Sequence, residues 1–204
     1  MRVCAIVGAG DFYSERFEIE KYEFIIAADG GALSLEKIGI RPNLIVGDLD
    51  SLNFAPTGVE IRRFKVEKDE TDMHLALIEG AKRGYDTFYI FGGVGGRIDH
   101  TFANYCLLKY AKEQGFSVYL MDKDYYSFVI KNESVSIFGK EGRTFSAFAF
   151  GGEARGVSII GAKYEARDII MTPDFPLGVS NSFISEKAEL SVKDGALLVM
   201  AEYA

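Results

Sequence analysis

Two aspartates, separated by one residue, are the side chains of this sequence with the clearest chemical potential. Asp48 and Asp50 come directly after an apolar run at residues 44–46 and a glycine. Along an extended chain, side chains at i and i+2 point to the same side, so these carboxylates would lie close together. Such a pair repels itself unless a cation lies between, which indicates a divalent-metal site. On this stretch alone, a solvated turn with Ser51 as a helix cap explains the same residues better.

Other acidic residues also stand where an apolar run ends or a helix begins. Asp29 and Gly30 follow the run at residues 23–28, and Asp72 opens a helix-like segment. A carboxylate at a helix start is favoured by the helix dipole, so Asp72 alone indicates no more than a cap. Lys68, just before, has the equally simple interpretation of a solvated turn residue. Whether these residues have a functional role depends on where the fold places them.

A glycine-rich segment precedes the third expected helix. Four of the five residues 92–96 are glycine, and Arg97 comes next. So many glycines cost conformational order, which makes sense where backbone must approach a ligand closely. No Gly-Lys-Ser/Thr follows, so this is not a Walker A loop, but backbone N–H groups and Arg97 could still face phosphates at a helix start. His100 and Asn104 share a face of that helix, where packing or capping explains them equally well.

Strands that alternate with helices must position these residues. The pattern predicts strands at residues 2–7, 23–28, 44–46, 60–66, 87–91 and 116–121, with helices at 31–38, from 71 or 72 to 83, and at 98–114. This alternation is typical of an α/β domain with a mostly parallel sheet. Ligands bind outside the carboxyl ends of such strands. The rim would therefore gather five carboxylates beside the glycine segment, a set that favours Mg²⁺ and phosphoryl-type transfer: Asp29, Asp48, Asp50, Asp72 and Asp99.

The helical period disappears after residue 124. Short alternating runs replace it, which is typical of an antiparallel sandwich or barrel. We therefore predict an α/β domain over residues 1–124 and an all-β sandwich domain over 125–204. The expected strands lie at residues 134–138, 144–150, 157–160, 183–185, 188–192 and 196–201.

Composition excludes several classes of partner. A net charge of −7 argues against nucleic acid, and no apolar run approaches the ~18 residues of a membrane span. Cys4 and Cys106 have no CxxC partner and are expected to be buried free thiols in a reducing cytoplasm. After Gly8 and Gly10, the third glycine of a dinucleotide fingerprint is replaced by Tyr13. A dinucleotide cofactor is therefore not supported.

Four motifs together resemble those of the thiamine pyrophosphokinase family, in order and spacing. They are GDLDS at 47–51, KDETD at 68–72, GGVGGRIDH at 92–100 and GVSN at 178–181. The resemblance covers essentially the whole chain. It implies an N-terminal ATP-binding catalytic domain, a C-terminal thiamine-binding β-sandwich, and a cytoplasmic homodimer with active sites between subunits. It also implies transfer of a pyrophosphoryl group from Mg-ATP to the hydroxyl of thiamine, giving thiamine diphosphate and AMP.

The resemblance assigns roles to positions of this chain. It implies metal ligation by Asp48, Asp50 and Asp72, catalysis by Asp72, Asp99 and Arg97, and thiamine contacts by Ser180 and Asn181. Alone, Ser180 and Asn181 would indicate only a turn. Some members carry a tryptophan that packs on thiamine, and this chain has none. For ATP binding we expect a set drawn from the sheet rim and the glycine segment: Asp29, Gly30, Lys68, Gly93, Gly95, Gly96 and Arg97.

Three alternatives stay open from the residues. The proton acceptor is either Asp72 or Asp99. A pyrophosphokinase acting on another acceptor, such as a pterin, would keep the same acidic rim. A thiamine- or nucleotide-binding sensor would keep the fold, although it has no need for so many clustered carboxylates.

Overall fold

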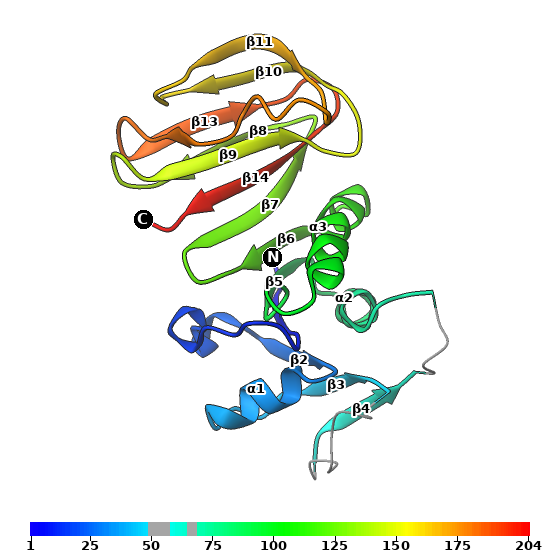
Figure 1. Ribbon diagram of the computed structural model, residues 1–204. Helices are drawn as coiled ribbons and strands as arrows, with labels where there is room; N and C mark the ends of the chain where they lie inside the picture. The colour runs from blue at the N-terminus through cyan, green and yellow to red at the C-terminus, as the bar shows by residue number, and fades with distance from the viewer. Residues whose placement is uncertain (49–57, 65–68) are drawn as a thin grey trace. The chain divides into compact units, whose positions relative to one another are not determined.

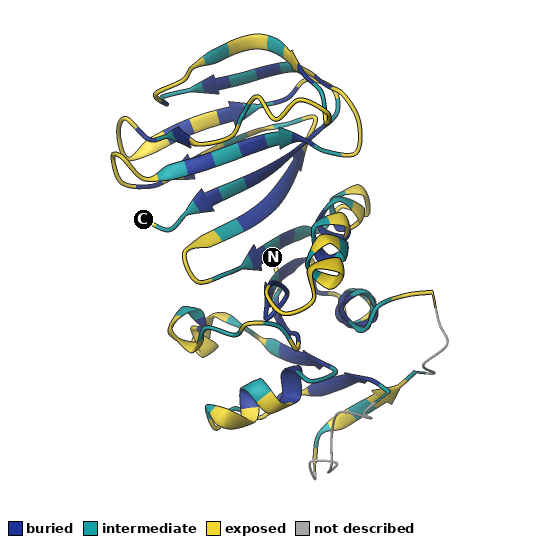
Figure 2. Cartoon of the chain, viewed as in Figure 1, coloured by how far each residue is buried: buried dark blue, intermediate teal, exposed yellow. Residues whose placement is uncertain are grey.

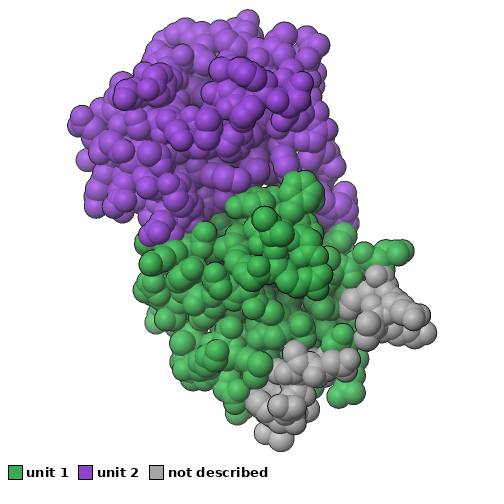
Figure 3. Space-filling model, in the orientation of Figure 1, with its two compact units in different colours: residues 1–107, 115–123 green, residues 108–114, 124–204 purple. Residues whose placement is uncertain are grey.

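The computed structural model of the protein describes residues 1–48, 58–64 and 69–204. It divides into two compact units (Figure 3). Unit 1 comprises Met1–Leu107 and Gly115–Lys123, and unit 2 comprises Leu108–Gln114 and Asp124–Ala204. The predicted domain boundary at residue 124 stays a prediction.

Unit 1 contains a parallel six-stranded sheet, as the alternation of strands and helices predicted (Figure 1). The strand order is β6-β5-β1-β2-β3-β4. The central strands are buried, whereas the edge strand β4 is mostly exposed. The six strands are β1 (Val3–Val7), β2 (Phe24–Ala28), β3 (Leu44–Gly47), β4 (Glu60–Arg63), β5 (Thr87–Phe91) and β6 (Ser117–Met121).

Helices α1 (Gly31–Lys37) and α2 (Asp72–Lys82) cover opposite faces of this sheet. Ala32 and Leu35 of α1 pack in one apolar cluster with alternate residues of the sheet, Ala5, Val7, Ala27 and Ile45. On α2, a Cβ at Gly80 would lie 2.5 Å from the Phe88 ring and 3.4 Å from Ile26. Because side chains alternate along a strand, these contacts belong to the other face. The close approach at Gly80 holds α2 firmly against the sheet.

Residue types at the helix ends explain where the helices begin. Thr71 caps α2, and its Oγ1 accepts a hydrogen bond from the His74 N–H at 3.2 Å. This confirms the predicted start of that helix at Thr71 or Asp72. Helix α3 (Ile98–Glu113) follows the glycine segment directly, and two 3₁₀ turns, η1 (Ser14–Arg16) and η2 (Ile19–Lys21), precede β2. Asp72 is therefore the first residue of α2, and Arg97 immediately precedes α3.

From Asp124 onward unit 2 is all-β, as predicted, and its strands form two antiparallel sets of four. Their orders are β12-β9-β14-β7 and β11-β10-β13-β8. Figure 2 shows buried and exposed residues alternating along these strands. The strands are β7 (Tyr125–Lys131), β8 (Ser134–Phe138), β9 (Thr144–Ala149), β10 (Ala154–Ile160), β11 (Ala166–Met171), β12 (Asn181–Ser182), β13 (Lys187–Ser191) and β14 (Ala196–Glu202).

Two expectations from the sequence are wrong. The strand predicted at residues 183–185 is absent among the described residues, because β12 ends at Ser182 and the only β-pairing of Phe183 is an isolated bridge to Ala162. Cys4 is buried as expected, but Cys106 is exposed. The apolar side of α3 carries Leu107, Leu108 and Ala111, and the 3.6-residue helical period places Cys106 on the opposite side.

No described helix is long and apolar enough to cross a membrane.

Candidate active site

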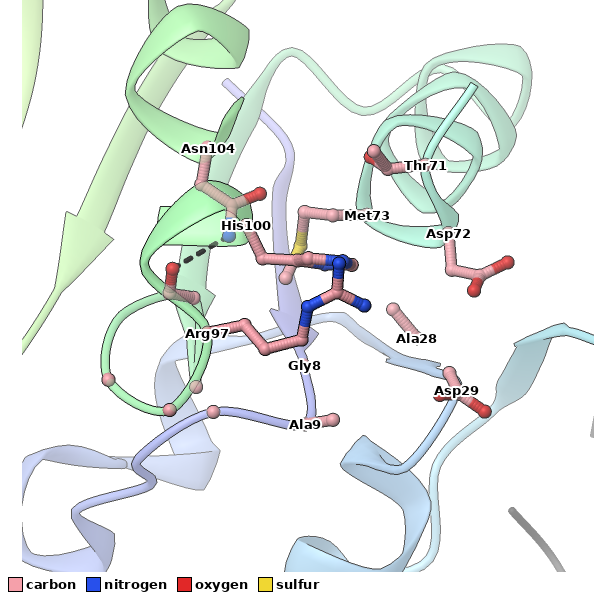
Figure 4. Close-up of a pocket in the computed structure, with 15 residues that line it drawn as sticks. Gly8, Ala9, Ala28, Asp29, Thr71, Asp72, Met73, Arg97, His100 and Asn104 are labelled. Atoms are coloured by element: carbon pink, nitrogen blue, oxygen red, sulfur yellow. Dashed lines mark hydrogen bonds between the residues drawn. The ribbon is translucent and has the colours of Figure 1, made fainter. Parts of the chain in front are cut away.

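A cavity of about 370 Å³ lies within unit 1, and it collects the ends of several elements of the parallel sheet (Figure 4). The turns after β1, β2 and β5 contribute to its wall, as do the first turns of α2 and α3. This is the edge where ligands bind in open α/β sheets. Its lining residues are Gly8, Ala9, Gly10, Ala28, Asp29, Thr71, Asp72, Met73, Gly92, Gly93, Gly95, Gly96, Arg97, His100 and Asn104.

The turn after β1 holds the glycine segment in place. Gly10 donates its N–H to the Gly92 carbonyl, and Asp11 donates to the Val94 carbonyl, both at 2.8 Å. A Cβ at Gly10 would lie 2.3 Å from the Val94 oxygen, so a side chain there could not be accommodated without a backbone shift. The close backbone approach that the glycines predicted is therefore present between these two turns.

A buried side chain of α3 also holds the glycine segment in place. Asn104 is 7% exposed, and its Nδ2 donates to the Gly93 carbonyl at 2.7 Å. The carbonyl oxygens of Gly92, Gly93 and Val94 thus all accept hydrogen bonds from protein donors. This fixes the segment at the start of α3, where the helix dipole favours an anionic ligand.

Arg97 and Asp99 form a two-pronged ion pair at the same helix start. Arg97 donates Nη2 to Asp99 Oδ2 at 2.6 Å and Nε to Oδ1 at 3.2 Å. Both side chains are exposed. The hydrogen bond from Arg97 lowers the pKa of Asp99, and that from Asp99 raises the pKa of Arg97. The described cavity wall includes Arg97 but not Asp99, and Figure 4 shows the Arg97 guanidinium extending into the cavity.

Asp29 and Asp72 provide the carboxylates of the cavity wall. Asp29 has a positive φ of 47°, and its N–H donates to the Val46 carbonyl at 2.8 Å, which joins the ends of β2 and β3. Asp48 follows β3 directly but does not belong to the described wall. Asp50, the remaining expected metal ligand, and Lys68 lie outside the described residues.

The described residues contain no group of three His, Cys, Asp or Glu side chains that could hold a metal ion. The expected set of Asp48, Asp50 and Asp72 includes a residue outside that part of the chain. Metal ligation by these three residues therefore stays a prediction.

The expected thiamine contacts, Ser180 and Asn181, lie in unit 2. Asn181 is buried, and its carboxamide bridges to the main chain of Tyr164: Oδ1 accepts from the N–H at 3.0 Å and Nδ2 donates to the carbonyl at 2.8 Å. Ser180 is exposed with a φ of 55°, and its N–H donates to Ser146 Oγ at 3.1 Å. Asn181 thus shapes the turn that carries Tyr164.

Asn181 and Tyr164 also line a second cavity, of about 400 Å³, within unit 2. Its wall is largely apolar, with Glu165 and Arg167 as the charged members. The full lining is Ile159, Tyr164, Glu165, Ala166, Arg167, Ile169, Met171, Leu177, Gly178, Val179 and Asn181.

The first cavity brings together many of the residues expected from the sequence and adds others. Asp29, Asp72, Gly93, Gly95, Gly96 and Arg97 share its wall, whereas Gly30 caps α1 and does not belong to the described lining. Thr71, Met73, His100 and Asn104 were not among the assigned residues. The shared helix face of His100 and Asn104 was a usable signal, because both reach the cavity. Met73 carried no signal beyond its apolar helical spacing.

Two family models match this chain. "Thiamin pyrophosphokinase, catalytic domain" matches residues 16–120, and "Thiamin pyrophosphokinase, vitamin B1 binding domain" matches residues 128–197. The chain belongs to the thiamine pyrophosphokinase family. It is therefore an enzyme, and the sensor alternative is set aside.

Relatives of the thiamine pyrophosphokinase family match over nearly the whole chain. The thiamine pyrophosphokinase of Bacillus subtilis (strain 168) is 28% identical over 192 residues, which cover 89% of this chain and 88% of that protein. A crystal structure of thiamine pyrophosphokinase from Bacillus subtilis superposes with a TM-score of 0.89 at 24% identity, covering 99% of both chains. A family protein from Enterococcus faecalis gives 0.84 at 25% identity, covering 100% of both. The fold is thus shared from end to end.

Proposed function

We propose that this enzyme transfers a pyrophosphoryl group from Mg-ATP to the hydroxyl of thiamine, giving thiamine diphosphate and AMP. The observation that carries the proposal is the cavity of unit 1, which is lined by the glycine segment, Arg97 and two carboxylates. Family membership supports thiamine as the acceptor. Phosphoryl-type transfer relies on positioning and charge neutralisation, which these groups are suited to supply.

The phosphates of ATP bind at the glycine segment and the start of α3. Main-chain groups there stand at the positive end of the helix dipole, and Arg97 adds a charge-assisted contact. Arg97 is already paired with Asp99, so phosphate binding exchanges one anionic partner for another. The residues proposed for ATP are those of the rim and the segment: Asp29, Gly30, Lys68, Gly93, Gly95, Gly96 and Arg97.

The carboxylates suit a hard divalent cation. Asp72 offers oxygen donors on the cavity wall, and Asp48 stands at the end of an adjacent part of the sheet. We assign Asp48, Asp50 and Asp72 to Mg²⁺, which keeps few protein ligands and is shared with substrate phosphates. When bound, the ion neutralises charge on the transferred group.

Asp72 suits the role of proton acceptor better than Asp99. In the transfer, the thiamine hydroxyl oxygen bonds to the β-phosphorus of ATP, the bond from that phosphorus to the oxygen bridging the α- and β-phosphorus breaks, and AMP leaves with that oxygen. The hydroxyl proton passes to a carboxylate. Asp72 lies on the cavity wall, whereas the pKa of Asp99 is lowered by its hydrogen bond from Arg97, which makes Asp99 the poorer base.

Thiamine contacts are proposed for Ser180 and Asn181. The Asn181 carboxamide is hydrogen-bonded to the main chain of Tyr164, so besides its proposed contact with thiamine it fixes the shape of that turn. The exposed Ser180 contributes a hydroxyl. Some family members pack a tryptophan on thiamine, and this chain has no tryptophan. Tyr164 is an aromatic side chain on the wall of the second cavity, and it is 61% exposed.

The functional form is proposed to be a cytoplasmic homodimer with active sites at its interface, on the resemblance to the family. Exposed apolar side chains just before Ser180 support a covering partner, because Phe175, Leu177 and Val179 are 64%, 53% and 55% exposed. The molar mass in solution, from light scattering, tests the dimer. A monomer at assay concentration that turns over normally would contradict it.

The activity is tested by incubating the protein with Mg-ATP and thiamine and measuring AMP and thiamine diphosphate. Equimolar formation of both products supports the proposal. AMP formed with a pterin alcohol but not with thiamine would favour the other acceptor. Release of ADP or phosphate instead of AMP would contradict pyrophosphoryl transfer.

A further inference from the structure

The carboxamide of Asn104 has one side committed to the protein and one side turned to the cavity. Its Nδ2 donates to the Gly93 carbonyl at 2.7 Å, and the residue is 7% exposed. Figure 4 shows the oxygen of Asn104 pointing away from Gly93, toward the part of the cavity where Met73 and His100 lie. One polar atom of a buried side chain therefore faces the ligand space.

The orientation of this carboxamide is fixed by its partner. A main-chain carbonyl only accepts hydrogen bonds, so the amide nitrogen must face Gly93. A flipped carboxamide would place two oxygens against each other and lose the bond. Asn104 therefore presents an acceptor, Oδ1, to the cavity.

An acceptor at this place selects for a particular part of a nucleotide. Among the described residues, no protein group is recorded as a donor to Asn104 Oδ1, and an acceptor at the cavity wall that a bound ligand shields from water without offering a donor is costly. Triphosphate oxygens at neutral pH carry no proton to offer, whereas the nucleoside part has N–H and O–H donors. Asn104 also lies seven residues after Arg97 in the sequence and inside α3, away from the helix start where phosphate is favoured.

We infer that Asn104 Oδ1 accepts a hydrogen bond from the adenosine part of ATP and is a specificity-determining residue for the nucleotide. The inference rests on the proposed use of ATP in this cavity. The donor is an N–H or O–H group, either the 6-amino group of adenine or a ribose hydroxyl. The same side chain fixes the glycine segment through Gly93, so it links recognition of the nucleoside to the place of the phosphates.

The test measures dissociation constants by calorimetry, without thiamine, for wild type and Asn104→Ala. The ligands are Mg-ATP and three analogues that each lack one donor: purine riboside triphosphate, 2′-deoxy-ATP and 3′-deoxy-ATP. One analogue is expected to bind wild type about tenfold more weakly than ATP, as a lost hydrogen bond requires. That penalty is expected to disappear in Asn104→Ala, and the analogue that shows it identifies the donor.

Asn43→Ala is the matched control, because it also deletes a carboxamide that bonds main chain. Its Oδ1 accepts from the Ile25 N–H at 2.8 Å. This variant is expected to lower the melting temperature but to keep the wild-type ratios between ATP and its analogues. A change in those ratios as large as that of Asn104→Ala would overturn the inference, because loss of stability would then explain both.

The wild-type arm decides the question even if Asn104→Ala fails to fold. Three analogues that bind wild type as tightly as ATP overturn the inference, and so does the absence of ATP binding. Asn104→Ser is the second variant, and an undiminished analogue penalty in it also overturns the inference. Binding with the expected ratios but no thiamine diphosphate formation would refute the proposed function and leave Asn104 as a nucleotide-recognition residue.

Discussion

Arg97 is paired with Asp99 in the structure, whereas its proposed partner in catalysis is a phosphate group of ATP. It is held by Asp99 in two hydrogen bonds, an arrangement that keeps the guanidinium in place before any phosphate arrives. Because both groups are exposed, water screens the pair and exchange for a phosphate costs little. The ion pair therefore acts as a support for Arg97.

Replacement of Arg97 by methionine is expected to reduce kcat/KM for Mg-ATP by about 100-fold, because a charge-assisted contact to the transferred group is lost. Steady-state AMP formation measures the effect. Arg155→Met removes a comparable exposed arginine, paired with Glu153 in unit 2, and should leave kcat/KM within about twofold. Equal losses in both variants would contradict a phosphate role for Arg97.

Gly10 makes the second residue-scale prediction. A Cβ there would lie 2.3 Å from the Val94 oxygen and 2.8 Å from the Gly92 oxygen, so Gly10→Ala must push the glycine segment away. We expect a loss of about 2 kcal/mol in the free energy of unfolding and weaker ATP binding. Urea denaturation and calorimetry measure the two effects. Gly152→Ala has nothing within 4 Å of its added Cβ and should be neutral; a neutral Gly10→Ala would be inconsistent with the close approach.

At the scale of elements, Glu79 joins α2 to the exposed edge strand through Arg83. Glu79 accepts hydrogen bonds from Lys82 and Arg83 at 2.8 Å, and Arg83 reaches Glu60 of β4 at 2.8 Å. Burial alone would raise the pKa of Glu79, but hydrogen bonds from Lys82 and Arg83 outweigh it and hold that pKa below its usual value. This cluster secures β4, whose remaining backbone pairing is to β3.

A lowered pKa in the folded state makes this cluster sensitive to acid. Its contribution is present above the unfolded pKa of Glu, about 4.3, and is lost as pH falls through the lower folded value. Glu79→Gln should therefore be less stable than wild type near pH 6, by about 2 kcal/mol, and the difference should shrink below pH 4. Urea denaturation from pH 6 to 3 checks this.

Glu189→Gln removes an exposed acid that is paired with Lys187 and serves as the control. Solvent screens that pair, so its removal should change the acid dependence far less. A constant gap between Glu79→Gln and wild type at every pH would be evidence against the cluster's role.

Elements were predictable where the apolar pattern matched their environment. Buried parallel strands such as β3 and β5 read as continuous apolar runs, and most antiparallel strands showed alternation. Strand β11 was missed because its pattern is largely exposed, with Arg167 and Asp168 inside it. The predicted strand at 183–185 failed because Phe183 is buried by packing on Phe145 instead of by strand pairing.

At the scale of the whole molecule, the buried side chains that the structure describes in the two units are mostly hydrophobic. Removal of Mg²⁺ with a chelator is therefore expected to abolish AMP formation while leaving the melting temperature within about 2 °C. Thermal unfolding followed by circular dichroism, beside the activity assay, measures both. Added Mg²⁺ should restore turnover; activity that persists in chelator would refute metal dependence.

The part of the candidate site that depends only on the order of strands and helices was predictable from the sequence. Parallel strands bring their carboxyl ends to one edge, so Asp29, Asp72 and Arg97 could be expected together from their places in the sequence. The role of Asn181 could not be predicted, because its partner Tyr164 is 17 residues away in the sequence and strand β11 lies between them. The same holds for Asn104, whose contact with Gly93 spans 11 residues.

One cysteine is buried and the other is exposed, so the exposed thiol of Cys106 is a native attachment point for a probe. Cys4 lies in the core of the sheet, and burial raises its pKa to about 12, whereas Cys106 is exposed on α3. A thiol reagent should therefore modify one cysteine in the folded protein and two after denaturation, a ratio that absorbance of the released chromophore measures. A fluorophore or spin label could then be placed on the helix that carries Asn104, without engineering a single residue, to follow nucleotide binding in real time.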